Sequence, residues 1–191
     1  MKVLFVLTYY KPYWTGLTRY AARVAEGLAK RGHQVSVVCT QHDKTLAKEE
    51  LIKGVKVYRV PSLSQISRSQ LSPLFVFKAG RLIKEAEAII VYFPLAEIVL
   101  IALVAKIFRK KLFLVHNGDL VLPQGFVNRL LEKIFYLTTS WAIGLADKVI
   151  VLTEDYSEKS PLLSKFKNKW EVILAPCAIG RPSSKDKLIK N

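Results

Sequence analysis

Hydrophobic residues along the chain alternate between short continuous runs and stretches in which they recur every three to four positions. The continuous runs are bounded by polar or turn-forming residues, which is typical of buried β-strands. We expect strands at residues 3–8, 35–40, 55–60, 88–92, 111–116, 148–153 and 171–175. Residues 55–60 alternate apolar and basic side chains, so we expect this strand at an edge of the sheet.

Helical spacing fills most of the intervals between these runs. It predicts helices at residues 17–31, 73–87, 126–145 and 154–158, and one that opens near Pro94. Gly32 ends the first helix, and residues 45–50 and 62–72 are polar enough to be loops. Nearly continuous apolar strands that alternate with helices indicate an α/β fold, with a Rossmann-like, mostly parallel sheet and helices on both faces.

The length of 191 residues suits one such domain at residues 1–180, with a polar tail at 181–191 that we expect to be disordered. The most hydrophobic segment, residues 88–108, could be mistaken for a membrane span. Pro94 and Glu97 interrupt it, and neither part reaches the roughly 20 residues that a span needs.

The formal net charge is +15, which favours an anionic partner. Charge alone does not choose among nucleic acid, anionic lipid and phosphorylated substrates. The two cysteines, Cys39 and Cys177, have no metal-ligand spacing and form no disulfide framework, so we expect a reducing compartment.

Ligands of parallel α/β sheets bind beyond the carboxyl ends of the strands. The first such loop contains neither a G-x-G-x-x-G fingerprint nor a P-loop, and its single glycine, Gly16, follows Thr15 directly before the helix. The free N–H groups of that helix start could hold a phosphate or a sugar hydroxyl, or the segment is a plain turn. Metal-binding clusters are not evident, and we expect no metal.

Four further candidates lie at strand ends. His116 ends one strand and is either a cleft residue or a core histidine. Asn117 and Asp119 follow in a turn, where Asp119 could bind a sugar hydroxyl or cap the turn itself. Glu154 could hold a substrate group or only interact with a helix dipole.

The order of these pieces resembles the N-terminal, acceptor-side domain of family 4 glycosyltransferases, which have the GT-B fold. The motifs that carry the resemblance are GLAKRGHQVSVV, HNGD and VIVLTEDYSEKSPLL, and it covers residues 2–179. It implies retaining transfer of a sugar from a nucleotide-sugar donor to a hydroxyl of a lipid-linked or saccharide acceptor, without a metal. It matches His116 to a histidine that contacts the donor sugar, and the pair Thr15 and Gly16 to a glycine pair near the substrates, with one glycine replaced.

The resemblance also implies a second, donor-binding domain that this sequence does not contain. We therefore expect the chain to be inactive without a second domain or a separate chain that supplies it. The alternative is a non-catalytic binding or regulatory remnant. A nucleic-acid-binding α/β domain is a more remote alternative, because the chain has no recognisable nucleic-acid motif, and we expect no nucleic-acid partner.

Basic residues beside aromatic ones suggest weak binding to an anionic membrane surface. They could equally be the solvated side of ordinary helices. The residues are Arg109, Lys110 and Lys111 after one apolar helix, and Arg129, Lys133, Phe135 and Trp141 within another. We expect a cytoplasmic protein, peripheral at the inner membrane face.

Overall fold

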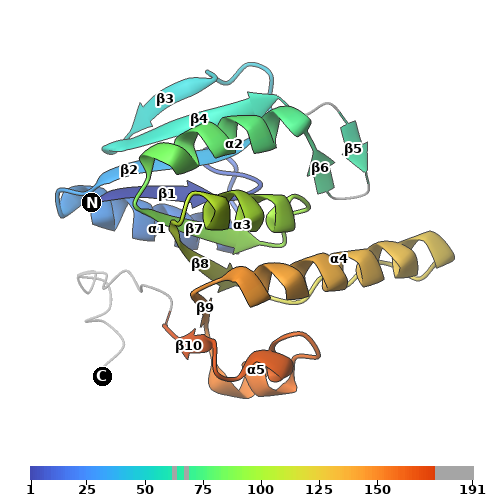
Figure 1. Ribbon diagram of the computed structural model, residues 1–191. Helices are drawn as coiled ribbons and strands as arrows, with labels where there is room; N and C mark the ends of the chain where they lie inside the picture. The colour runs from blue at the N-terminus through green and yellow to red at the C-terminus, as the bar shows by residue number, and fades with distance from the viewer. Residues whose placement is uncertain (62–63, 67–68, 175–191) are drawn as a thin grey trace, which may run out of the picture.

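The computed structural model describes residues 1–61, 64–66 and 69–174, and Figure 1 shows their arrangement around one twisted sheet. The eight strands of this sheet lie in the order β10-β9-β8-β7-β1-β2-β4-β3. Their bounds are β1 Lys2–Val6, β2 Gln34–Gln41, β3 Glu49–Ile52, β4 Val55–Pro61, β7 Ala88–Phe93, β8 Lys111–His116, β9 Lys148–Val151 and β10 Trp170–Val172. All neighbours pair in parallel except β3 and β4. A separate two-stranded antiparallel ribbon pairs β5 Ser64–Ile66 with β6 Ser69–Leu71.

Helices cover both faces of the sheet (Figure 1). Their bounds are α1 Gly16–Lys30, α2 Pro73–Glu85, α3 Ile98–Ile107, α4 Phe126–Leu145, α5 Glu154–Lys159 and a 3-10 turn at Leu163–Phe166. Successive strand residues point to opposite faces, which produces two cores. Val3 and Phe5 pack with α1 on one face, whereas Leu4 and Val6 pack with α2, α3 and α4 on the other. The α/β, mostly parallel fold with helices on both faces is confirmed.

Local chemistry explains where α1 begins and ends. Thr15 is its N-cap, and a capping box joins the Thr15 and Thr18 side chains to each other's backbone N–H groups. Gly32 follows the helix with a φ of 84°, a conformation that glycine adopts without steric cost. The helix therefore places its N-terminus directly after the loop that leaves β1.

Several sequence expectations were wrong in detail. Residues 55–60 do not form an edge strand, because β3 pairs with β4 and takes that place, and β3 includes part of the expected loop at 45–50. The helix expected near Pro94 begins only at Ile98.

Two further expectations concern the end of the chain. The last strand is shorter than residues 171–175 and ends at Val172. The tail at 181–191, together with Cys177, lies outside the described residues.

Candidate functional site

The carboxyl ends of β1, β7 and β8 lie side by side and bring their loops together. Phe93 of β7 is paired in register with His116 of β8, so the two strands end at the same level. The Thr8 hydroxyl, just after β1, donates a hydrogen bond of 3.2 Å to the carbonyl of Pro94, just after β7. The edge where the strand-end rule places a ligand is therefore a continuous set of loops.

His116 is a buried polar residue at this edge, with 2% of its surface exposed. Its Nε2 lies 3.2 Å from Asp119 Oδ1, and its ring packs at 4.9 Å from the Phe93 ring centroid. Burial lowers the pKa of His116 below its usual 6.5, although Asp119 acts in the opposite direction. The imidazole is thus neutral at pH 7. A carboxylate only accepts hydrogen bonds, so Nε2 carries the proton and Nδ1 is the acceptor nitrogen.

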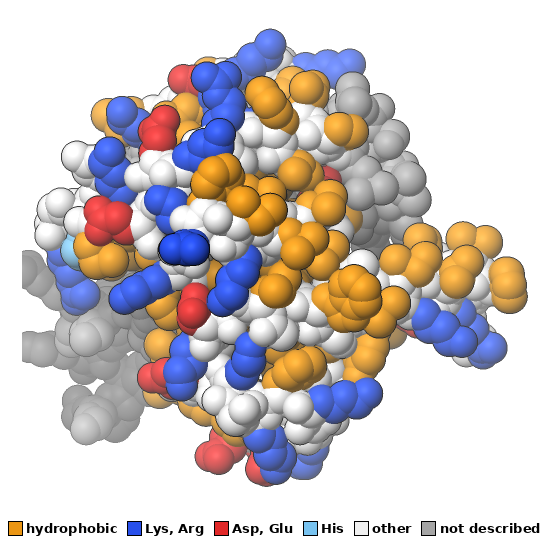
Figure 2. Space-filling model, viewed as in Figure 1, with side chains coloured by type: hydrophobic (Ala, Val, Ile, Leu, Met, Phe, Trp, Pro, Cys, Tyr) orange, Lys and Arg blue, Asp and Glu red, His pale blue; other side chains and the backbone are white. Residues whose placement is uncertain are grey.

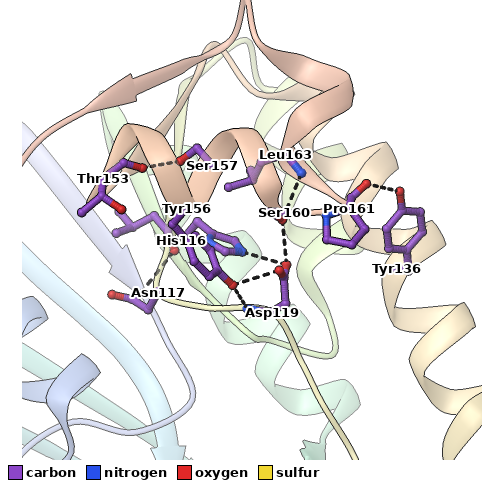
Figure 3. A network of polar contacts seen from close by, with 11 residues as sticks. His116, Asn117, Asp119, Tyr136, Thr153, Tyr156, Ser157, Ser160, Pro161 and Leu163 are labelled. Carbon is purple, nitrogen blue, oxygen red and sulfur yellow. Dashed lines mark hydrogen bonds and ion pairs between the residues drawn. The ribbon is translucent and has the colours of Figure 1, made fainter.

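Asp119 is the centre of a polar network that ties the loop after β8 to α5 (Figure 3). The Tyr156 hydroxyl donates to Asp119 Oδ2 at 2.9 Å and accepts from the Asp119 N–H at 2.8 Å. The Ser160 hydroxyl donates to Asp119 Oδ1 at 3.1 Å and accepts from the Leu163 N–H at 3.3 Å. Tyr156 and Ser160 thereby hold the carboxylate in place, and the carboxylate orients the His116 ring through Nε2.

A cavity of about 600 Å³ opens beside this network, between the loop after β8 and α4. This volume is in the range of small-molecule sites. The lining residues are Phe93, His116, Gly118, Asp119, Leu120, Val121, Arg129, Glu132, Lys133, Phe135, Tyr136, Pro161 and Leu162. The walls are mostly apolar, and Arg129 and Lys133 add positive charge, so the cavity suits a molecule with both an apolar and an anionic part.

The loop between β1 and α1 carries the other predicted pair. The Thr15 side chain accepts a hydrogen bond of 3.1 Å from the Thr18 N–H, so it caps α1. A Cβ on Gly16 would meet no atom within 4 Å, so the fold itself does not require glycine there. Open space at a helix start is what a ligand phosphate or hydroxyl needs.

The structure divides the predicted residues into two groups. His116, Asn117 and Asp119 lie together at the end of β8 and in the loop that follows it. The Asn117 amide donates a hydrogen bond of 3.4 Å to the Val115 carbonyl. Glu154 is exposed in the first turn of α5, outside the cavity lining. Thr15 and Gly16 do not line the cavity beside His116 and belong to the neighbouring first loop.

Aromatic side chains gather at the first loop and the loop after β2, two segments that the strand-end rule covers without singling out these residues. The rings of Tyr9 and Tyr13 on the first loop lie with their centroids 4.6 Å apart, and both pack against the ring of His42, which directly follows β2. Trp14, next to Tyr13 in the first loop, is 59% exposed. The stretch YYKPYW, dense in aromatic residues directly after a strand, was the available signal. Nothing local identified Tyr156 or Ser160, which meet Asp119 from 37 and 41 residues away.

Buried Arg59 anchors the first loop. Its guanidinium donates to the carbonyls of Lys11 at 2.8 Å and Ala47 at 2.9 Å and lies 2.7 Å from Glu50 Oε2. Lys11 also forms an ion pair with Glu26 of α1. The loop is therefore tied to both β4 and α1, which fixes where its aromatic side chains lie.

Within residues 1–61, 64–66 and 69–174, no three His, Cys, Asp or Glu side chains are grouped as metal ligands would be. Among the helices in that part of the chain, none combines the length and the apolar character needed to cross a membrane.

Comparison with known proteins agrees with this arrangement. The model of glycosyltransferase family 4 matches residues 14–173. Sucrose-phosphate synthase from Thermosynechococcus elongatus has a TM-score of 0.58 at 13% identity, over 91% of this chain and 48% of that one. Anabaena HepE in complex with UDP has a TM-score of 0.58 at 21% identity, over 93% of this chain and 44% of that one.

UDP-GlcNAc 2-epimerase from Methanocaldococcus jannaschii has a TM-score of 0.56 at 15% identity, over 91% of this chain and 45% of that one. The chain thus spans about half the length of these three proteins. No curated protein matches the sequence significantly. The family match covers most of the chain, and the chain belongs to glycosyltransferase family 4, with the fold of the N-terminal domain of its GT-B enzymes.

Proposed function

We propose that this chain is the acceptor-side domain of a retaining glycosyltransferase that moves a sugar from a nucleotide-sugar donor to a hydroxyl acceptor. The observation that carries the proposal is the buried, neutral His116 at the carboxyl edge of a family 4 domain, beside a cavity of about 600 Å³. HepE, which shares the fold, is a complex with UDP, and a nucleotide sugar is accordingly the proposed donor.

In the proposed reaction the bond between the donor sugar C1 and its phosphate oxygen breaks, and a bond from C1 to the acceptor oxygen forms. The acceptor hydroxyl proton passes to the departing phosphate. His116 contacts the donor sugar as a neutral hydrogen-bonding group, and Asp119 holds its ring in position. No bound metal takes part in the reaction as proposed.

The remaining predicted residues have binding roles. Thr15 and Gly16 present the N-terminus of α1 to a phosphate or hydroxyl. Asn117 and Glu154 contact the substrates from the loop after β8 and the start of α5. The chain spans about half the length of its structural neighbours. We therefore propose that a second domain or a separate chain completes the donor-binding site, and that the chain is inactive without it.

The proposed setting is the cytoplasm, at the inner face of a membrane, where a lipid-linked or saccharide acceptor would be met. The net charge of +15 supports weak attraction to anionic lipid.

A transfer assay tests the proposal. The purified chain is incubated with radiolabelled UDP- and GDP-sugars and a membrane lipid extract, with and without lysate of the source cells depleted of this protein. We expect transfer only when chain and lysate are combined, and loss of that transfer with His116→Ala. Transfer by the chain alone would contradict the need for a second half. No transfer in any combination would favour a non-catalytic binding or regulatory role.

A further inference from the structure

Helix α4 carries an unpartnered apolar stripe on its outer side. Its members lie at helical spacing, and each exposes half or more of its surface. They are Phe126 at 85%, Val127 at 66%, Leu130 at 51%, Ile134 at 50%, Leu137 at 56% and Trp141 at 65%. At 3.6 residues per turn these six positions fall within an arc of about 100° and extend over about 22 Å of helix.

The opposite side of α4 packs against the body in the C-terminal half of the helix. Thr139, Ala142 and Ile143 are buried against the sheet, and Glu132 accepts a hydrogen bond from the Leu122 N–H. The stripe is therefore not a misplaced core face. An amphipathic helix of a soluble domain points its apolar arc inward, whereas α4 has a second apolar arc that points outward.

The stripe continues onto the neighbouring helices. Leu100, Leu103 and Ile107 of α3 are 47%, 43% and 72% exposed, and α3 packs directly against α4. Figure 2 shows hydrophobic side chains gathered over α2 and α3 and continuing along the part of α4 that projects from the body. We call the exposed apolar residues of α3 and α4 the docking surface. A continuous apolar surface of this kind marks an interaction site.

The charges around the docking surface favour an anionic partner. Residues 98–111 and 126–145 together contain six basic side chains and one acidic side chain, Glu132. The basic residues are Lys106, Arg109, Lys110, Lys111, Arg129 and Lys133. On the helical wheel of α4, Arg129 and Lys133 lie next to the stripe on one side.

We propose that the docking surface binds an anionic lipid bilayer, with α4 lying in the plane of the headgroups and its apolar stripe reaching the acyl chains. An apolar arc bordered by lysine and arginine, with aromatic residues at both ends, is the composition of an interfacial helix. A protein partner fits less well, because lysine is depleted from protein interfaces. The proposal deepens and rests on the proposed function. Arg129 and Lys133 also line the cavity beside His116, so docking brings that cavity to lipid-linked acceptors.

Vesicle co-sedimentation tests the proposal without any transfer reaction, so its outcome is separate from that of the transfer assay. The chain is centrifuged with vesicles of phosphatidylcholine alone or mixed with phosphatidylglycerol. We expect binding to the mixed vesicles, and at least about tenfold weaker partitioning for Ile134→Ser/Leu137→Ser, because two half-exposed side chains lose their burial. Each of Lys106→Gln and Lys133→Gln should weaken binding to the mixed vesicles by about fivefold.

Matched variants remove the same groups elsewhere. Leu51→Ser/Leu174→Ser deletes two exposed leucines, 68% and 76% exposed, outside the docking surface, and should bind as the wild type does. Brominated lipid should quench Trp141 fluorescence, so the quenched fraction should disappear in Trp141→Phe and persist in Trp14→Phe. Both tryptophans are exposed, at 65% and 59%, so neither substitution disturbs a core.

Three results would overturn the proposal. One is failure of the wild type to bind the mixed vesicles, and another is equal binding by the stripe variant and its control. The third is a different interaction of the same surface, observed while no protein sediments with vesicles. Self-association that the stripe variant abolishes would assign the surface to a second copy of the chain. Retention on a random oligonucleotide that the stripe variant abolishes would assign it to nucleic acid.

Discussion

Replacing Asp119 by alanine should destabilise the domain by about 2–3 kcal/mol. The carboxylate accepts hydrogen bonds from His116, Tyr156 and Ser160 at 3.2, 2.9 and 3.1 Å. A hydrogen bond to a charged group contributes about 1.5–3 kcal/mol, so three give a gross value of about 4.5–9 kcal/mol. Asp119 is 29% exposed and Tyr156 is 42% exposed, so water replaces part of this interaction, and we reduce the value accordingly.

Urea unfolding followed by circular dichroism measures this change. Asp155→Ala is the matched control, because Asp155 lies on α5 beside Tyr156 and its carboxylate forms an ion pair with Lys159 at the exposed surface. We expect its midpoint to stay close to that of the wild type. A loss below about 0.5 kcal/mol for Asp119→Ala, the size typical of surface substitutions, would refute the view that Asp119 organises the site.

Asp119→Asn separates charge from shape. Asp119 raises the pKa of His116 against the effect of burial, so the neutral amide should let that pKa fall further. An NMR titration of the His116 ring protons gives the direction of the change. An unchanged or raised pKa would contradict the contact between the two side chains.

Three further predictions follow from the same contacts. Arg59→Met should lower the free energy of unfolding by about 1–3 kcal/mol and speed amide hydrogen exchange in the loop around Lys11. Lys56→Met, on the exposed side of β4, should change neither quantity. The pKa of His116 is lower in the folded state, so the unfolded chain takes up the proton first as the pH falls below 6.5. The unfolding free energy should therefore fall there, and less steeply in His116→Gln, as urea unfolding over a pH series would show. EDTA should leave lysate-supported transfer unchanged, and inhibition that a divalent cation reverses would contradict the proposed chemistry.

The sheet could be predicted from the sequence because buried parallel strands are continuous apolar runs. β3 could not, because two of its four residues are Glu49 and Glu50 and its stability comes from backbone pairing with β4. The burial of Arg59 also escaped prediction. Its side chain is 1% exposed beside Glu50, and such a pairing of distant residues leaves no local pattern.

The candidate site, like the sheet, could be predicted only in part from the sequence. The strand-end rule identified His116 and the loop with Thr15 and Gly16, because that rule depends only on strand direction. Two partners of Asp119, Tyr156 in α5 and Ser160 directly after it, required the three-dimensional structure. The apolar character of α4 was also evident, but periodicity alone does not say which of two apolar arcs faces the sheet.

The central claim is that ligands bind at the carboxyl edge of the sheet, and hydrogen exchange with mass spectrometry tests it most directly. The structure offers a contrast, because a second cavity of about 390 Å³ lies at the opposite edge, between residues such as Lys2, His33 and Gly54. Amide hydrogens of the chain are exchanged for deuterium in the presence and absence of UDP- and GDP-sugars and a membrane lipid extract. We expect protection in the peptides that contain residues 8–16 and 116–122. Protection confined to the opposite edge would contradict the account.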